Sequence, residues 1–162
     1  MNILIIENEI YLAQKVVSRL LDDGHSCDYI ESPNIDNLTK EYDTILLSTS
    51  LPSALCKNII KRYSENAIIL LLVSYISDET VTNPIKDGAK DYIMKPFIMD
   101  ELVRKIYHYK ECRSIRRELQ TLREYFNFTM AEIDTTDVLL PPSFPTLVET
   151  NSQKCADKLV FE

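Results

Sequence analysis

Three nearly continuous apolar segments constrain the fold of this chain most strongly. They are Ile3 to Ile6, Thr44 to Leu47 and Ile68 to Val73, and none alternates with polar residues. A strand with one wet face alternates, whereas a strand in a parallel sheet is covered by helices on both faces and is apolar throughout. The pattern therefore predicts a parallel sheet enclosed by helices.

Helical patterns and shorter strands lie between these segments. Ile10 to Leu21 repeats apolar residues at helical spacing and is followed by Gly24, a helix-ending signal. The other expected elements are a strand over Cys27 to Ile30, a brief helix over 36–42, a helix over 54–66, a helix that is short or broken at Asn83, and a strand over Tyr92 to Met94. This order predicts an α/β, doubly wound, five-stranded parallel sheet with five helices, ending near Lys110.

A long helix is expected from about Met99 to Phe126, because apolar residues recur there by threes and fours. The predicted organisation is a domain over 1–110, a helical linker over 111–128, and the start of an effector region over 129–162. The last segment ends on uncovered apolar residues, which indicates either a partner surface or, as we favour, the start of a second domain. Its strand, loop and helix order around Lys154 is a weak nucleotide-site pattern without glycines, so ATP binding is not expected.

Composition narrows the class of protein. Hydrophobic residues make up 45% and charged residues 27%, the longest apolar run is too short for a bilayer, and no signal segment is recognised, so we expect a cytoplasmic protein with no membrane contact. The net charge of -7 argues against nucleic-acid binding through a basic surface of this segment. The chain has only two glycines, which excludes a glycine-rich nucleotide loop. No cofactor or small-molecule substrate is expected.

The four cysteines are widely scattered. Cys27, Cys56, Cys112 and Cys155 form no CxxC pair and have no His-rich neighbour, so the pattern suggests neither a zinc site nor a disulfide framework. Idle or buried thiols are expected, with a redox sensor as the alternative.

Polar residues follow the predicted strands at their carboxyl ends. They are Glu7, Asn8 and Glu9 after the first strand, Ser48 after the third, Ser74 after the fourth and Lys95 after the fifth. In open parallel sheets the working site lies at this edge, so these side chains are expected to meet.

Four segments resemble the receiver domain of bacterial response regulators. They are "ILIIENE", "YDTILLSTSLP", "LLLVS" and "GAKDYIMKPF", and the resemblance covers about Met1 to Tyr109. In that family an aspartate accepts phosphate beside a magnesium-binding acidic pair. The resemblance places the acceptor on Ser48, the acidic pair on Glu7 and Asn8, the hydroxyl on Ser74, the lysine on Lys95, the switching aromatic on Tyr92, and a cis peptide bond before Pro96.

The departures from the family pattern fall at the phosphate-acceptor and magnesium-binding positions. Phosphoryl transfer to a carboxylate needs an ionised nucleophile and a magnesium ion, but Ser48 is neutral and Asn8 replaces one carboxylate. The sequence therefore predicts no aspartyl phosphate, no metal and no enzymatic activity. Lys95 is expected to pair with Glu7, with a solvent-facing lysine as the alternative, and Ser48 is either a blocked acceptor or an ordinary loop serine.

Two surfaces are candidates for dimerisation. Asp91, Glu101 and Lys105 match charged positions at which receivers of transcription regulators dimerise, although a solvated helix face explains them equally well. The long helix has an apolar seam flanked by paired charges, which favours a two-stranded dimer over a helix folded back on its own domain. The seam contains Ile115, Leu119 and Leu122.

These patterns support three hypotheses. The first is an orphan, phosphorylation-independent response regulator in a two-component setting, which forms a homodimer and controls transcription through a C-terminal DNA-binding region mostly absent from these residues. The alternative is a stand-alone protein-interaction module that does not bind DNA. The third, a magnesium-dependent phosphoryl acceptor using Glu7 or Ser48, is disfavoured by the missing carboxylates.

Overall fold

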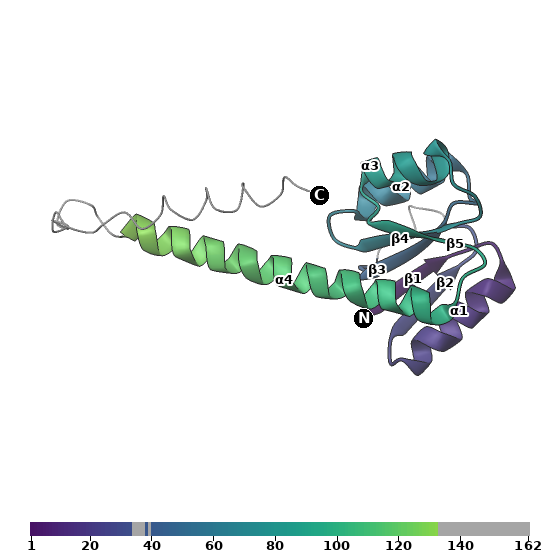
Figure 1. Cartoon of the computed structure of the whole chain (residues 1–162), viewed down its shortest axis with the longest axis horizontal. Helices are drawn as coiled ribbons and strands as arrows, with labels where there is room; N and C mark the ends of the chain where they lie inside the picture. Colours follow the sequence, from purple (N-terminus) through teal and green to yellow (C-terminus); the bar gives the residue numbers. More distant parts are fainter. Residues whose placement is uncertain (34–37, 39, 133–162) are drawn as a thin grey trace, which may run out of the picture. The chain divides into compact units, whose positions relative to one another are not determined.

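A computed structural model describes residues 1–33, 38 and 40–132, with side chains described up to residue 127. Five parallel strands form one sheet in the order β2-β1-β3-β4-β5 (Figure 1). The elements are β1 (Asn2–Ile6), α1 (Ile10–Asp22), β2 (Ser26–Ile30), β3 (Thr44–Ser48), α2 (Ser53–Tyr63), β4 (Ile68–Val73), the π-helical segment η2 (Asp78–Thr82), α3 (Asn83–Asp87), β5 (Asp91–Met94) and α4 (Met99–Glu132). The predicted α/β fold with a five-stranded parallel sheet is confirmed.

The three central strands are buried on both faces, which explains their continuous apolar sequences. In β1, Leu4 and Ile6 pack on one face while Ile3 and Ile5 pack on the other, since successive side chains of a strand point to opposite faces. Strands β3 and β4 alternate in the same way, and none of their residues is exposed. Each face therefore needs its own layer of helices.

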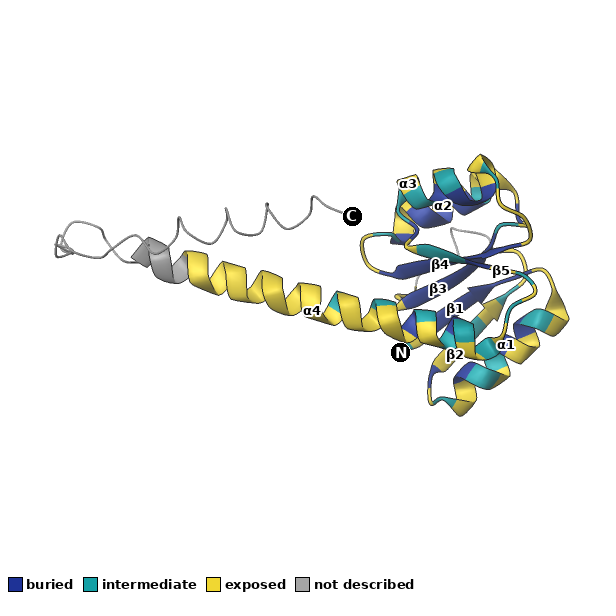
Figure 2. Ribbon diagram, in the orientation of Figure 1, coloured by how far each residue is buried: buried dark blue, intermediate teal, exposed yellow. Residues whose placement is uncertain are grey.

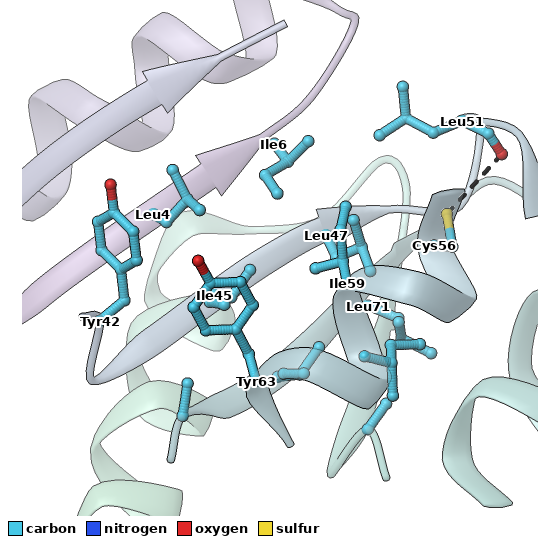
Figure 3. Packing of buried hydrophobic residues seen from close by; sticks show 14 of the residues in the cluster. Leu4, Ile6, Tyr42, Ile45, Leu47, Leu51, Cys56, Ile59, Tyr63 and Leu71 are labelled. Atoms are coloured by element: carbon cyan, nitrogen blue, oxygen red, sulfur yellow. Dashed lines mark hydrogen bonds between the residues drawn. The ribbon is translucent and has the colours of Figure 1, made fainter. Parts of the chain in front are cut away.

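Helices α2 and α3 cover one face of the sheet, and α1 with the beginning of α4 covers the other (Figure 1). Figure 3 shows the first core, where Ile59 and Tyr63 of α2 pack with Leu4, Ile45 and other strand residues. On the second face, Leu102 and Ile106 of α4 pack with residues of α1 and the strands. The exposed sides of the same helices are visible in Figure 2.

The helix expected over 36–42 is not present in the part of that segment that the structure describes. Leu38 and Lys40 to Tyr42 adopt no helix, and residues 36, 37 and 39 lie outside the described residues. The Leu38 carbonyl instead accepts hydrogen bonds from Arg62 at 2.8 Å and the Tyr63 hydroxyl at 3.0 Å, and Tyr42 donates to Asp28 at 3.0 Å. These tertiary bonds take the place of local helical ones, so the helix predicted over 36–42 is not seen in the described residues of that segment.

The segment before β5 is interrupted where the sequence predicted. The π-helical turns of η2 end at Thr82, and α3 begins at Asn83 with Pro84 in its first turn. A proline is tolerated there because the first amides of a helix have no intrahelical partner. The hydroxyls of Ser77 and Thr80 cap the start of η2 reciprocally.

Helix α4 extends further than expected. It runs to Glu132, and every described side chain from residue 114 to residue 127 is exposed. The chain divides into two compact units, Met1–Gln120 and Thr121–Glu162. The proposed division into 1–110, 111–128 and 129–162 stays a prediction, and the expected effector region lies almost entirely outside the described residues. Within the described part of the chain, no helix has both the length and the apolar character that a membrane span needs.

Candidate functional site

The carboxyl ends of β1, β3 and β5 bring together three polar side chains from distant parts of the sequence. Strand order reverses between β1 and β3, and ligand sites of open α/β sheets form beside such a reversal. Glu7 follows β1, Ser48 is the last residue of β3, and Lys95 follows β5. The parallel register carries their backbones to the same edge of the sheet.

The Lys95 ammonium is the centre of this site. Its Nζ lies 2.6 Å from Glu7 Oε2, 3.0 Å from Glu9 Oε1 and 3.2 Å from Ser48 Oγ. The ammonium donates hydrogen bonds to Glu9 Oε1 and Ser48 Oγ, and it meets Glu7 Oε2 as an ion pair. The Lys95 side chain is 8% exposed, which contradicts the solvent-facing alternative and confirms the expected pair with Glu7.

Glu7 is a fully buried carboxylate with partners on several sides. Its Oε1 accepts a hydrogen bond from the Glu9 amide at 3.0 Å, while Oε2 meets Lys95 through an ion pair without a well-aligned hydrogen bond. The Tyr29 hydroxyl donates to the Glu7 carbonyl at 3.0 Å. Partial burial, followed by the charges of Glu31 and Glu7, raises the pKa of Tyr29. Glu7 therefore acts as the internal counter-charge of Lys95.

Ser48 is fully buried and surrounded by hydrogen-bond donors. Its Oγ accepts from Lys95 and, at 3.4 Å, from the Ser50 amide, and its carbonyl accepts from the Cys56 thiol at 3.6 Å. Burial raises the pKa of Cys56 to about 11, so this thiol is neutral at pH 7. A serine nucleophile needs a neighbouring base to take its proton, whereas Lys95 and the Ser50 amide donate hydrogen bonds to Ser48 Oγ.

The remaining predicted residues are distributed around this centre. Asn8 and Ser74 are exposed, and Ser74 lines a neighbouring pocket of about 820 Å³ together with Thr49 and Tyr75. Tyr92 is half-buried and packs against the core beneath α2 and α3. The Lys95–Pro96 peptide bond is cis. The receiver motif assigns no role to Glu9, which pairs with Lys95. Its position in the sequence, as the last acidic residue of "ENE" after the first strand, could have indicated this contact.

Two of the three charged positions considered for dimerisation pair with each other within one chain. Lys105 Nζ lies 2.5 Å from Asp91 Oδ2, and both side chains are half-buried. Glu101 is half-buried in the first turn of α4, where its amide donates to the Ile98 carbonyl. By contrast, Ile115, Leu119 and Leu122 are 50%, 61% and 63% exposed. The helix seam is therefore the more available of the two surfaces.

Among the described residues, no group of three or more His, Cys, Asp or Glu side chains is placed to hold a metal ion.

Comparison with known proteins shows sequence similarity to transcriptional regulatory proteins. No family model matches the chain. Over 113 residues it is 33% identical to the transcriptional regulatory protein DltR of Streptococcus agalactiae, covering 65% of this chain and 50% of that protein. It is 27% identical over 176 residues to the transcriptional regulatory protein KdpE of Staphylococcus aureus, covering 99% of this chain and 74% of that protein.

A solved structure has the same architecture. The CheY-like response regulator receiver domain from Methanospirillum hungatei matches with a TM-score of 0.64 at 20% identity, covering 71% of this chain and 97% of that one. The chain spans about half the length of DltR. The described sheet has the fold of that receiver domain, and the chain shows receiver-domain homology with transcriptional regulators.

Proposed function

We propose that this chain is the receiver part of an orphan transcription regulator that works without phosphorylation of an aspartate. The observation that carries the proposal is the environment of Lys95, whose ammonium already has Glu7, Glu9 and Ser48 as oxygen partners within 3.2 Å. In a phosphorylated receiver, a phosphoryl oxygen would take such a place. Here the chain's own side chains satisfy the lysine permanently.

The chemistry around Ser48 supports this reading. The position carries no charge, receives hydrogen bonds from Lys95 and Ser50, and has the protonated Cys56 behind it. Magnesium binds through several oxygen ligands and gives up its water reluctantly. Glu7 is committed to Lys95, so a cation would have to break a buried ion pair before it could bind. The protein is accordingly a regulator and not an enzyme, with its state set by expression level, a partner or another modification.

Dimerisation through α4 is the second part of the proposal. Successive exposed residues at positions 112, 115, 119, 122 and 126 are separated by alternating steps of three and four, the a and d spacing of a coiled coil. Glu111 and Glu118 then occupy g positions, and Arg116 and Arg123 occupy e positions. In a parallel pair each g residue faces the e residue of the partner's next heptad, so both contacts join opposite charges.

The output is the third part. DltR and KdpE are transcriptional regulatory proteins, and the alignment with KdpE extends past the receiver. A parallel dimer of α4 would carry two copies of a C-terminal DNA-binding region side by side, which suits a two-fold symmetric DNA site. The proposed location is the cytoplasm, where a transcription regulator meets DNA.

A second candidate, docking on another signalling protein without DNA contact, is favoured by one observation. Tyr75, Ile76 and Ile98 are 63%, 56% and 72% exposed in the segments that follow β4 and β5. Selection of genomic DNA fragments by the full-length protein separates the candidates. Recovery of a specific duplex supports the regulator, and recovery of none supports the docking module.

Intact-mass measurement after incubation with acetyl phosphate and magnesium tests the inactive pocket. The parent protein should keep its mass, and a stoichiometric phosphate adduct on it would overturn the proposal. The variant Asn8→Asp/Ser48→Asp restores both missing carboxylates and serves as the positive control. It should gain an adduct, because a carboxylate nucleophile is ionised at pH 7 and the added charge favours a divalent ion.

A further inference from the structure

His108 and Cys112 form a pair of metal-ligand side chains on α4, away from the Lys95 site. Both are exposed, and Cys112 Sγ lies 3.8 Å from His108 Nε2. They are four residues apart, which places them on one face of the helix. The same spacing allows two histidines of a helix to chelate zinc in metalloproteases.

The separation of the two donor atoms fits one edge of a tetrahedral zinc site. Zinc binds sulfur at about 2.3 Å and nitrogen at about 2.0–2.1 Å, and a tetrahedral angle then places the two donors about 3.5 Å apart. The observed 3.8 Å is close to this value without any change of backbone. The pair is therefore arranged as half of a site with two sulfur and two nitrogen ligands.

A second copy of the chain can provide the other half. Cys112 occupies an a position and His108 the preceding d position of the seam that continues through Ile115 and Leu119. In a parallel two-stranded dimer, a residues face a′ residues and d residues face d′ residues. The two Cys112 thiols and the two His108 imidazoles would then meet at successive layers of one seam.

His108 and Cys112 lie on a different side of α4 from the residue that contacts the receiver backbone. Arg113, the residue after Cys112, donates to the backbone carbonyls of Asp43 and Asn66 and so marks the side of the helix that faces the receiver. At about 100° per residue, the centre of the seam lies about 130° around the helix from Arg113. A partner helix can therefore reach His108 and Cys112 without displacing the receiver contacts.

We propose that His108 and Cys112 of two chains bind one zinc ion between them, at the receiver end of the helical seam. The proposal rests on the parallel dimer of the proposed function, and the shared zinc ion would cross-link the two chains of that dimer. Each Cys112 thiol loses its proton on binding, so the site takes up one zinc ion and releases two protons, and affinity rises with pH. The seam from Cys112 to Phe126 is short for a coiled coil. A shared metal would stabilise the dimer at its receiver end, where the polar His108 and Cys112 would otherwise weaken the helix pairing.

Cobalt titration with sedimentation of the same samples tests the site. The chain is kept reduced, and Co²⁺ is added while absorbance is recorded. We expect tetrahedral d–d bands and a thiolate-to-cobalt charge-transfer band that saturate at one metal per two chains and are lost when Zn²⁺ is added. Cys112→Ser should lose the charge-transfer band, and His108→Ala should lose the tetrahedral d–d pattern. Cys27→Ser is the control, because it removes another thiol and should keep both signals.

The two proposals fail in different ways. If the chain is a dimer in chelator but shows no charge-transfer band when Co²⁺ is added, the helical dimer is supported and the metal site is overturned. A monomer both in chelator and in saturating metal overturns both. A dimer that forms or tightens with metal, at one ion per two chains, supports both, and saturation at one ion per chain overturns the shared site.

Discussion

Lys95 and Glu7, which are 88 residues apart in the sequence, form a buried ion pair of 2.6 Å at the edge of the sheet. The Glu7 side chain is completely buried, so its charge has lost its hydration and depends on the lysine. Glu9, whose side chain is 57% exposed, adds a second, weaker carboxylate to the same ammonium. The pair joins the segments after β1 and β5 in one fixed arrangement.

Removing the lysine should destabilise the protein strongly. Lys95→Met keeps most of the side-chain volume but leaves the Glu7 carboxylate buried and unpaired, and we expect a loss of about 3–5 kcal/mol in the free energy of unfolding. Urea denaturation measures this value. Adding Glu7→Gln removes the stranded charge and should recover about 1–3 kcal/mol.

An exposed lysine provides the matched control for that experiment. Lys57 lies 3.9 Å from Asp87, and its side chain is 56% exposed. Lys57→Met should change stability by no more than about 1 kcal/mol, because solvent screens surface pairs. If Lys95→Met and Lys57→Met lose the same free energy of unfolding, the buried pair of Lys95 and Glu7 stabilises the protein no more than an exposed pair does.

Gly88 should tolerate alanine less well than Gly24. Both have positive φ angles, +127° and +79°, so alanine strains the backbone at either position. A Cβ on Gly88 would also lie 2.6 Å from Ser64 Cβ, whereas a Cβ on Gly24 would meet nothing within 4 Å. Gly88→Ala should therefore lose about 1–3 kcal/mol more than Gly24→Ala in urea denaturation. Ser64→Gly in the Gly88→Ala background should recover part of the difference, and no recovery would contradict the clash.

The sheet could be predicted from sequence because its strands are buried on both faces. Ile3 to Ile6 and Ile68 to Val73 have no polar positions, and a parallel sheet covered by helices accounts for that simply. The same rule predicted the contact between Lys95 and Glu7, since the carboxyl ends of parallel strands share one edge.

Other features depend on contacts that no local pattern encodes. In the described residues of 36–42 no helix forms, because Arg62 and Tyr63 donate hydrogen bonds to the Leu38 carbonyl. The pairing of Asp91 with Lys105 follows from how α4 packs beside β5, and the sequence offered an intermolecular role equally well. The spacing of His108 and Cys112 is visible in the sequence, but the 3.8 Å between His108 Nε2 and Cys112 Sγ follows from their rotamers on α4.

Cys56 should make stability fall as the solution becomes alkaline. Burial raises its pKa from an ordinary 9.0 to about 11, so between these values the folded chain retains a proton that the unfolded chain has lost. Stability from this thiol is complete below pH 9 and is lost as the pH rises towards 11. Cys56→Ala should be less stable at pH 7 but should show a shallower decline from pH 9 to 11 in urea denaturation. A decline as steep as the parent's would show that the thiol does not titrate differently on unfolding.

Leu119→Asp should break the proposed helical dimer. Leu119 is 61% exposed in the single chain and lies at an a position, where a dimer would bury it against its symmetry mate. Facing carboxylates would be desolvated and repel each other, so we expect the dissociation constant to rise by more than about 100-fold. Sedimentation velocity over a concentration series measures it. Ser114→Asp, on an exposed position away from the seam, is the control and should leave the constant nearly unchanged.

The flanking charges should specify a parallel arrangement of the two helices. A parallel pair brings Glu111 beside Arg116 of the partner subunit, twice by symmetry, whereas an antiparallel pair brings e positions together and g positions together, so like charges meet. Arg116→Glu should weaken the dimer about fivefold at low salt, as expected for two exposed pairs, and the effect should shrink at high salt. Glu111→Arg combined with Arg116→Glu restores opposite charges in the parallel pair and should restore the dissociation constant. If the double variant is instead weaker than Arg116→Glu alone, the helices do not pair in the parallel register.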